Sequence, residues 1–154
     1  MMLNKASFKK TTISMLMALA LVLVLAIPAN AAAYSVQFLN SSGAPSTHAS
    51  SYIDGGAVDV TGSAGNYTVT VKLKNFEPSF PLIPVSYNYL KVDLNGGPTG
   101  DTVYEVSATK SVSGSYTYFT FSGVNNLTDN LPVALHVNAG GFHSAEYKLF
   151  IDWL

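Results

Sequence analysis

Residues 65–76, GNYTVTVKLKNF, contain the clearest secondary-structure signal of this chain. Tyr67, Val69, Val71 and Leu73 alternate there with threonines and lysines. Successive side chains of a strand point to opposite faces of its sheet, so strict alternation is typical of a strand with one apolar face. The stretch therefore predicts a half-buried β-strand.

Similar short stretches follow one another along the chain. They are rich in Val, Tyr, Phe and Thr and are separated by turn residues such as Gly, Asn, Ser and Pro. The other expected strands cover residues 34–39, 85–94, 102–107, 115–121, 131–137 and 145–154. No helical period is found beyond the first 33 residues. Seven or eight strands in about 120 residues predict an all-β fold, an immunoglobulin-like antiparallel β-sandwich, with a small barrel as the alternative.

The first 31 residues have the composition of a secretory signal peptide. Three lysines lie among the first ten residues, an apolar run extends from Met15 to Ile27, and small residues follow at 28–31. This run is shorter than the roughly 20 residues that a membrane-spanning helix needs. We expect residues 1–31 to be removed on export and residues 32–154 to form one domain; an uncleaved N-terminal anchor is the alternative.

The composition of residues 32–154 narrows the possible functions. These residues include five lysines and nine acidic residues, which give a net charge near −4. Nucleic acids select proteins with basic surfaces, so a nucleic-acid partner is not expected. All four methionines lie in the leader and cysteine is absent, which excludes sulfur ligands and cysteine nucleophiles. The candidate ligands that remain are histidines, tyrosines and carboxylates. Neither a GxSxG motif nor a paired carboxylate motif is found, so we expect no enzyme.

The closing stretch, residues 133–153, reads VALHVNAGGFHSAEYKLFIDW and predicts a hairpin around a Gly-Gly turn. Strand parity places His143, Tyr147 and Leu149 on one, inward face. His136 points outward by the same parity, as a solvent-facing or cross-strand histidine, which argues against a zinc or copper site shared by the histidines. His143 and Tyr147 then lie at the mouth of the core, where a ring or a metal could be held against apolar surface.

Four motifs give the chain a resemblance to the near-iron-transporter (NEAT) family of haem-binding domains from Gram-positive bacteria. They are AYSVQF at 33–38, THASSY at 47–52, GNYTVTVKLKNF at 65–76 and the closing hairpin. The resemblance implies an immunoglobulin-like sandwich with haem between that hairpin and a short 3₁₀ segment before the second strand. In the family's closing YxxxY motif, the first tyrosine binds ferric iron and the second supports it. Here these positions are His143 and Tyr147.

The resemblance also implies a set of residues around haem b. His143 is expected to bind the iron, since neutral imidazole is a common haem ligand, and His48 is expected as a second ligand on the distal face. The other expected contacts are Ser46 or Thr47 to a propionate, and Tyr52, Phe76, Val137 and Phe142 along the ring. A polar loop with a solvated His48, and a plain core role for Phe76 and Val137, remain open alternatives.

Together these expectations describe a secreted haem-binding protein, similar to a hemophore. It would capture haem, interact with other NEAT-type receptors or host haemoproteins, and pass the haem on for iron acquisition. We expect no nucleic-acid partner, no stable membrane insertion after signal cleavage, and no covalent wall anchoring, although an association with the cell envelope fits. Two alternatives are a NEAT-like protein-binding domain that has lost haem ligation and an unrelated immunoglobulin-like adhesion module.

Overall fold

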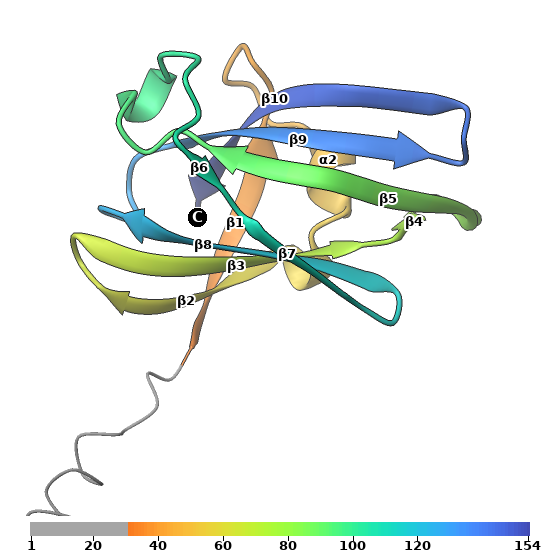
Figure 1. The fold of residues 1–154 in the computed structure, drawn as a ribbon, viewed down its shortest axis with the longest axis horizontal. Helices are drawn as coiled ribbons and strands as arrows, with labels where there is room; N and C mark the ends of the chain where they lie inside the picture. The colour runs from red at the N-terminus through yellow and green to blue at the C-terminus, as the bar shows by residue number, and fades with distance from the viewer. Residues whose placement is uncertain (1–30) are drawn as a thin grey trace, which may run out of the picture. The chain divides into compact units, whose positions relative to one another are not determined.

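Strand β1 (Ala32–Leu39) pairs with strands of two different sheets, and this decides the architecture (Figure 1). The computed structural model describes residues 31–154, so the expected signal peptide lies outside the described residues apart from Ala31. After β1 the elements are α2 (Thr47–Ser51), η1 (Asp54–Gly56), β2 (Ala57–Ser63), β3 (Asn66–Lys74), β4 (Phe76–Glu77), β5 (Phe80–Val92), η2 (Gly97–Thr99), β6 (Val106–Ser107), β7 (Thr109–Ser113), β8 (Tyr116–Val124), β9 (Leu131–Ala139) and β10 (His143–Trp153).

The two sheets form the layers of a sandwich. The first half of β1 pairs with β2, and the sheet continues through β3 and β8 to β7. Its second half pairs with β10, and that sheet continues through β9 and β5 to β4, with β6 also on β5. Every pairing is antiparallel. The predicted all-β antiparallel sandwich is therefore confirmed. The strand order ends at β4 in one layer and at β7 in the other, and these two strands do not pair to close a barrel.

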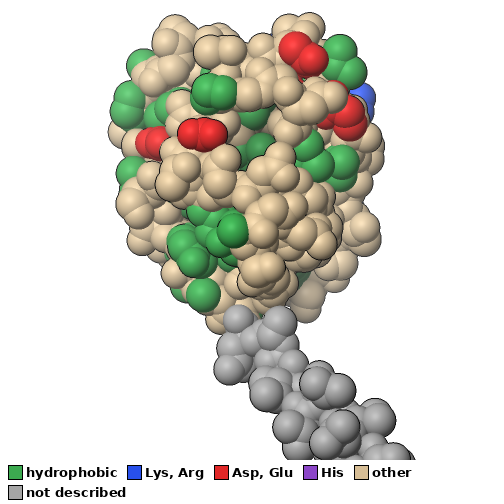
Figure 2. Space-filling model, turned by 90° about the vertical axis from the view of Figure 1, so that its left-hand side faces the viewer, with side chains coloured by type: hydrophobic (Ala, Val, Ile, Leu, Met, Phe, Trp, Pro, Cys, Tyr) green, Lys and Arg blue, Asp and Glu red, His purple; other side chains and the backbone are tan. Residues whose placement is uncertain are grey.

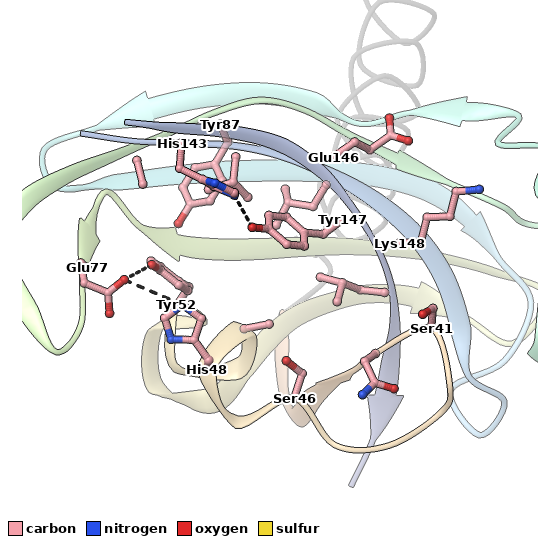
Figure 3. Close-up of a pocket in the computed structure, with 16 residues that line it drawn as sticks. Ser41, Ser46, His48, Tyr52, Glu77, Tyr87, His143, Glu146, Tyr147 and Lys148 are labelled. Atoms are coloured by element: carbon pink, nitrogen blue, oxygen red, sulfur yellow. Dashed lines mark hydrogen bonds and ion pairs between the residues drawn. The ribbon is translucent and has the colours of Figure 1, made fainter. Parts of the chain in front are cut away.

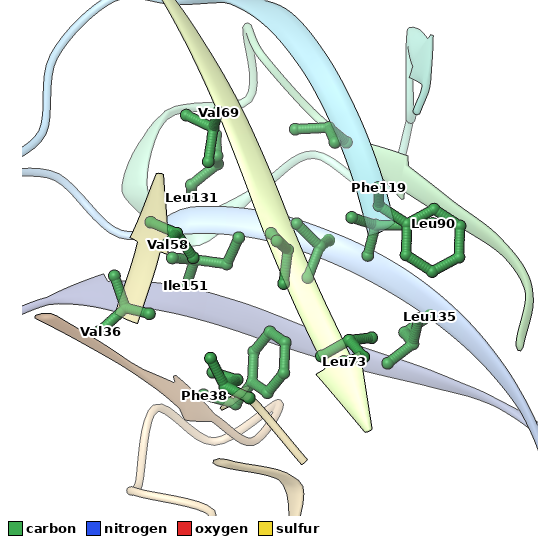
Figure 4. Packing of buried hydrophobic residues seen from close by; sticks show 14 of the residues in the cluster. Val36, Phe38, Val58, Val69, Leu73, Leu90, Phe119, Leu131, Leu135 and Ile151 are labelled. Atoms are coloured by element: carbon green, nitrogen blue, oxygen red, sulfur yellow. The ribbon is translucent and has the colours of Figure 1, made fainter. Parts of the chain in front are cut away.

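The core fills the space between the layers. Leu73 on β3 and Phe119 on β8 face Leu90 on β5 and Leu135 on β9, and all four are buried (Figure 4). The alternation in residues 66–74 places Val69, Val71 and Leu73 inward, as predicted. Apolar area removed from water is the main favourable term in folding, and with no cysteine the described domain relies on this packing.

Among residues 31–154, eight strands have five or more residues, within the predicted range, and β4 and β6 add two residues each. The strand expected at 102–107 is wrong for most of its length, because only Val106–Ser107 pair. Thr102 adopts a φ of 73°, a left-handed conformation that interrupts an extended chain. The expectation of no helix is also corrected, since α2 is an α-helix of five residues.

Acidic side chains are prominent at one end of the domain. Figure 2 shows the end that lies at the left in Figure 1, where acidic groups appear at several places and a basic group only at the margin. Residues 32–154 as a whole contain nine acidic residues and five lysines. The β9–β10 and β4–β5 turns point to the opposite end (Figure 1).

Candidate functional site

A pocket of about 570 Å³ lies between α2 and β10, and we refer to it as the α2–β10 pocket (Figure 3). Its volume is in the range of ligand and cofactor pockets. Its lining combines an apolar wall with polar groups at the rim. The lining residues are Asn40, Ser41, Ser46, His48, Ala49, Tyr52, Glu77, Tyr87, Leu135, Val137, Ala139, His143, Glu146, Tyr147, Lys148 and Leu149.

The β9–β10 hairpin supplies the apolar wall and one rim. Its register sets His143 opposite Ala139, and Tyr147 opposite Leu135. Directly opposite residues of an antiparallel pair lie on the same face, so these four side chains share the pocket side. Gly140, at a φ of 56°, makes the turn, and a Cβ there would lie 3.3 Å from Ile83. The turn thus fixes the point at which His143 begins the strand.

His143 and Tyr147 form a hydrogen-bonded pair at the mouth of the pocket. The Nε2 atom of His143 and the hydroxyl of Tyr147 are partners, and their ring centroids are 5.9 Å apart (Figure 3). Tyr147 is 41% exposed and His143 is exposed as well. Leu149, further along the same face, is buried. The predicted parity of this strand is confirmed, with the two polar side chains at the solvent end of the inward face.

The opposite rim comes from α2, which is tied to the strand before it. The backbone N–H of Phe38 donates to Oγ of Ser50 over 2.8 Å, and the N–H of Ser46 donates to the Phe38 carbonyl over 2.8 Å. His48 and Tyr52 lie one turn apart, with ring centroids 5.4 Å apart and edge to face. Both rims therefore present a histidine followed four residues later by a tyrosine.

Glu77, on β4, holds the α2 rim together. The Tyr52 hydroxyl donates to its carboxylate, and Nε2 of His48 lies 3.9 Å from the same oxygen (Figure 3). The hydrogen bond from Tyr52 lowers the pKa of Glu77. Burial and the Glu77 carboxylate raise the pKa of Tyr52, so Tyr52 stays a neutral phenol. In the described structure Tyr52 therefore acts as a hydrogen-bond donor to Glu77.

Tyr87, on β5, forms the floor of the pocket. Its hydroxyl donates to the carbonyl of Lys74 over 2.6 Å, and burial raises its pKa. The register between β5 and β9 shifts after Tyr87, which turns Tyr89 to the outer face. There Tyr89 packs against His136, with ring centroids 5.2 Å apart. His136 thus lies outside the pocket lining, in the cross-strand position predicted for it.

The structure brings six of the nine predicted site residues into the lining. They are Ser46, His48, Tyr52, Val137, His143 and Tyr147. Thr47 is exposed on α2, Phe142 is exposed at the hairpin turn, and Phe76 pairs with Pro84 in β4. These three do not line the pocket.

Several lining residues escaped the sequence prediction, and Glu77 and Tyr87 are the most important. Tyr87 lies two residues after the buried Val85, so the alternation of this strand could have placed its side chain on the inward face. Glu77 carried no such signal, because its place depends on the irregular pairing of β4 with β5.

A second polar cluster lies in the loop after β5. Carboxylate oxygens of Asp93, Asp101 and Glu105 lie within 4.8 Å of one another. The buried Asp93 accepts the backbone N–H groups of Gly96 over 2.6 Å and of Asp101 over 2.9 Å. Glu105 accepts the N–H of Leu94 over 3.0 Å. These carboxylates order the loop.

The comparisons with known proteins concern the fold. No protein-family model and no curated protein matches the chain. The described structure is similar to the NEAT5 domain of IsdX2, a B. anthracis hemophore in complex with heme, with a TM-score of 0.60. The fold is NEAT-like. The two chains are 14% identical, and the likeness covers 82% of this chain and 96% of that chain. Within residues 31–154, no helix of the NEAT-like domain is long and apolar enough to cross a membrane.

Proposed function

We propose that this protein binds haem b in the α2–β10 pocket and serves as a secreted, hemophore-like carrier. The observation that supports this most is the pair of histidine–tyrosine motifs facing each other across an apolar pocket (Figure 3). The similar NEAT5 domain is described as a hemophore domain in complex with heme. The proposal describes a binding protein and not an enzyme.

The residues of the pocket suit this ligand. Leu135, Val137 and Leu149 offer an apolar wall to a porphyrin face, while imidazole nitrogens at both rims match the nitrogen ligands that haem iron accepts. When bound, haem would supply a redox-active iron. We assign His143 as the proximal ligand and His48 as the distal one.

Tyr147 has a supporting role in this assignment. Its hydroxyl bonds Nε2 of His143, so it would orient the imidazole that we assign as the ligand. Tyr52, held as a neutral phenol by Glu77, contributes a ring wall beside His48.

The exposure of this pair favours exchange over permanent retention. His143 and Tyr147 lie at the pocket mouth, where a partner can approach the ligands without unfolding the core. Exchangeable ligation at the surface suits a carrier that takes haem from one partner, such as a host haemoprotein, and passes it to another NEAT-type receptor.

The test is a hemin titration of residues 32–154. We expect a Soret band with low-spin features, and His143→Ala should weaken hemin binding at least about 100-fold, because loss of a ligand exceeds the usual effect of its supporting partners. The matched control is His136→Ala, since His136 lies on the outer face of the same hairpin. A spectrum of the wild-type mixture identical to that of free hemin would contradict haem binding and favour a protein-binding role.

Two further variants separate the roles of the other rim residues. Retained low-spin bands in His48→Ala would remove His48 as the distal ligand while leaving His143 assigned. Full binding by His143→Ala with loss in Tyr147→Phe would show that the tyrosine ligates the iron and that the assignment of His143 is wrong.

A further inference from the structure

Two neighbouring turns carry large apolar side chains into solvent at one end of the domain. Phe80, Leu82 and Ile83 are 66%, 98% and 39% exposed. They belong to residues 78–85, which comprise the β4–β5 turn and the start of β5 and are called the first turn below. Phe142 of the β9–β10 turn is 97% exposed. We call these four residues the apolar tip. Ile83 and Phe142 both approach Gly140, at 3.3 and 3.1 Å from where its Cβ would stand. The N–H of Gly140 also donates to the Pro84 carbonyl over 2.8 Å, which joins the two turns.

The sequence of the two turns is free of charge. Residues 78–85 read PSFPLIPV and residues 139–142 read AGGF, with no acidic or basic side chain in either. Three prolines in the first turn remove backbone N–H donors that would otherwise need water or a partner. The turns are therefore suited to a medium that offers few hydrogen bonds.

The charged side chain nearest in sequence to the apolar tip is Glu77, which precedes the first turn and accepts the N–H of Ser79 over 3.2 Å. The end seen in Figure 2, opposite the two turns, carries acidic side chains at several places. Residues 32–154 have a net charge near −4, from five lysines and nine acidic residues. The apolar tip itself is uncharged, whereas the opposite end carries both acidic and hydrophobic side chains (Figure 2).

We propose that the apolar tip docks the folded domain on the surface of a lipid bilayer, by insertion of its four side chains into the interface between headgroups and acyl chains. Insertion of this kind scales with the apolar area buried and needs no complementary protein surface. Side chains of this size can bury together on the order of 500 Å². A second copy of the chain is a weaker candidate partner than a bilayer. A stable protein interface buries about 800 Å² on each partner, which is more than these four side chains provide.

The charge of the domain defines the lipid. With acidic residues in excess and no lysine in either turn, an anionic surface repels the domain, so the favoured bilayer is zwitterionic. Phe142 directly precedes His143, so docking would hold the mouth of the α2–β10 pocket at the bilayer surface. This docking does not depend on haem binding.

The test uses residues 32–154, because the apolar leader would bind lipid by itself and these residues form a compact unit with their own core. Flotation with dioleoyl phosphatidylcholine vesicles should carry the haem-free protein upward. Replacing Leu82→Ser together with Phe142→Ser should lower the partition coefficient at least tenfold, given the apolar area removed. The matched control is Val103→Ser, an exposed valine outside both turns, which should partition as the wild type does.

A second measurement keeps the test independent of these variants. The chain has no cysteine, so a single cysteine can carry an environment-sensitive fluorophore. A label at Leu82→Cys should shift to the blue with vesicles, whereas one at Ser63→Cys, the last residue of β2 at the other end, should not (Figure 1).

Four results would overturn the proposal. Wild-type protein could stay at the bottom of the gradient, or the double variant could float as the wild type does. Vesicles with 30% phosphatidylserine could bind more protein than zwitterionic vesicles do. Finally, sedimentation could reveal a dimer that the double variant abolishes, which would assign the apolar tip to a second copy.

Discussion

Glu77 is the residue on which the α2 rim of the pocket depends. It comes from β4, yet it accepts the hydroxyl of Tyr52 and faces the imidazole of His48. A carboxylate in this position favours a defined orientation of both rings. The β10 rim has no equivalent acid bonded to its pair, since His143 and Tyr147 bond each other. The two rims thus repeat a sequence spacing but differ in how they are held.

This hydrogen bond predicts a pKa change. In Tyr52→Phe the pKa of Glu77 should rise toward its ordinary value, because the phenol that stabilises the ionised carboxylate is gone. Carbon-detected NMR titration of the Glu77 carboxyl measures it. Tyr34→Phe, which removes a hydroxyl on β1, is the control. An unchanged Glu77 titration in Tyr52→Phe would show that the phenol does not set this pKa.

The same shift gives a pH dependence of stability. Because folding lowers the pKa of Glu77, its ionised form stabilises the fold above the ordinary carboxyl range. That contribution is lost as the pH falls through the lowered pKa. Urea unfolding of wild type and Glu77→Gln should therefore differ at pH 7 and converge in acid. A difference that grows in acid would contradict this sign.

Helix α2 is too short to be stable alone, so it depends on its contacts with neighbouring strands. Ser50 accepts the N–H of Phe38 on one side, and on the other Lys74 donates from its backbone to Tyr52 and from Nζ to Ser51, each over 2.9 Å. These bonds fix the position of His48 relative to the hairpin. The position of the α2 rim therefore depends on β1 and β3 as well as on the helix.

Two neighbouring serines test this dependence. Ser50→Ala leaves the Phe38 N–H without its partner and should lower the free energy of unfolding by about 1–3 kcal/mol. Ser51→Ala removes only a bond to the His48 carbonyl of the same exposed helix and should cost less than about 0.5 kcal/mol. Urea denaturation measures both values, and equal values would show that Ser50 does not anchor α2.

Elements with strict alternation were predictable, and those without it were not. The β10 strand was predicted with the right inward face because Tyr147, Leu149 and Ile151 alternate with mostly polar residues. In contrast, β7 reads TKSVS with all five residues exposed, so only its pairing with β8 makes it a strand. The sequence could not predict Glu77 in the pocket, because its position results from an irregular contact between β4 and β5.

At the scale of the whole domain, stability comes from apolar contacts across the two sheets. Leu73 is fully buried between them, in the same hydrophobic cluster as Phe38, Leu90 and Leu135 (Figure 4). Leu73→Ala should lower the free energy of unfolding by about 2–5 kcal/mol, through lost burial and the cavity left behind. Leu82→Ala, at the exposed apolar tip, should change it by less than about 0.5 kcal/mol. Urea denaturation compares the two, and a similar cost at both positions would contradict this core.

The division of β1 between two sheets has a consequence for the order of events in folding. Its second half pairs Val36 with Trp153, so two segments far apart along the chain must meet. Closing so large a loop costs chain entropy, and non-local pairs of this kind slow folding, so we expect this pairing to form late. Because α2 follows β1 directly and β10 carries His143, the pairing helps to bring the two rims together. We therefore expect hemin-binding capacity to appear in refolding experiments with the slowest phase; binding that appears in a fast phase would contradict this order.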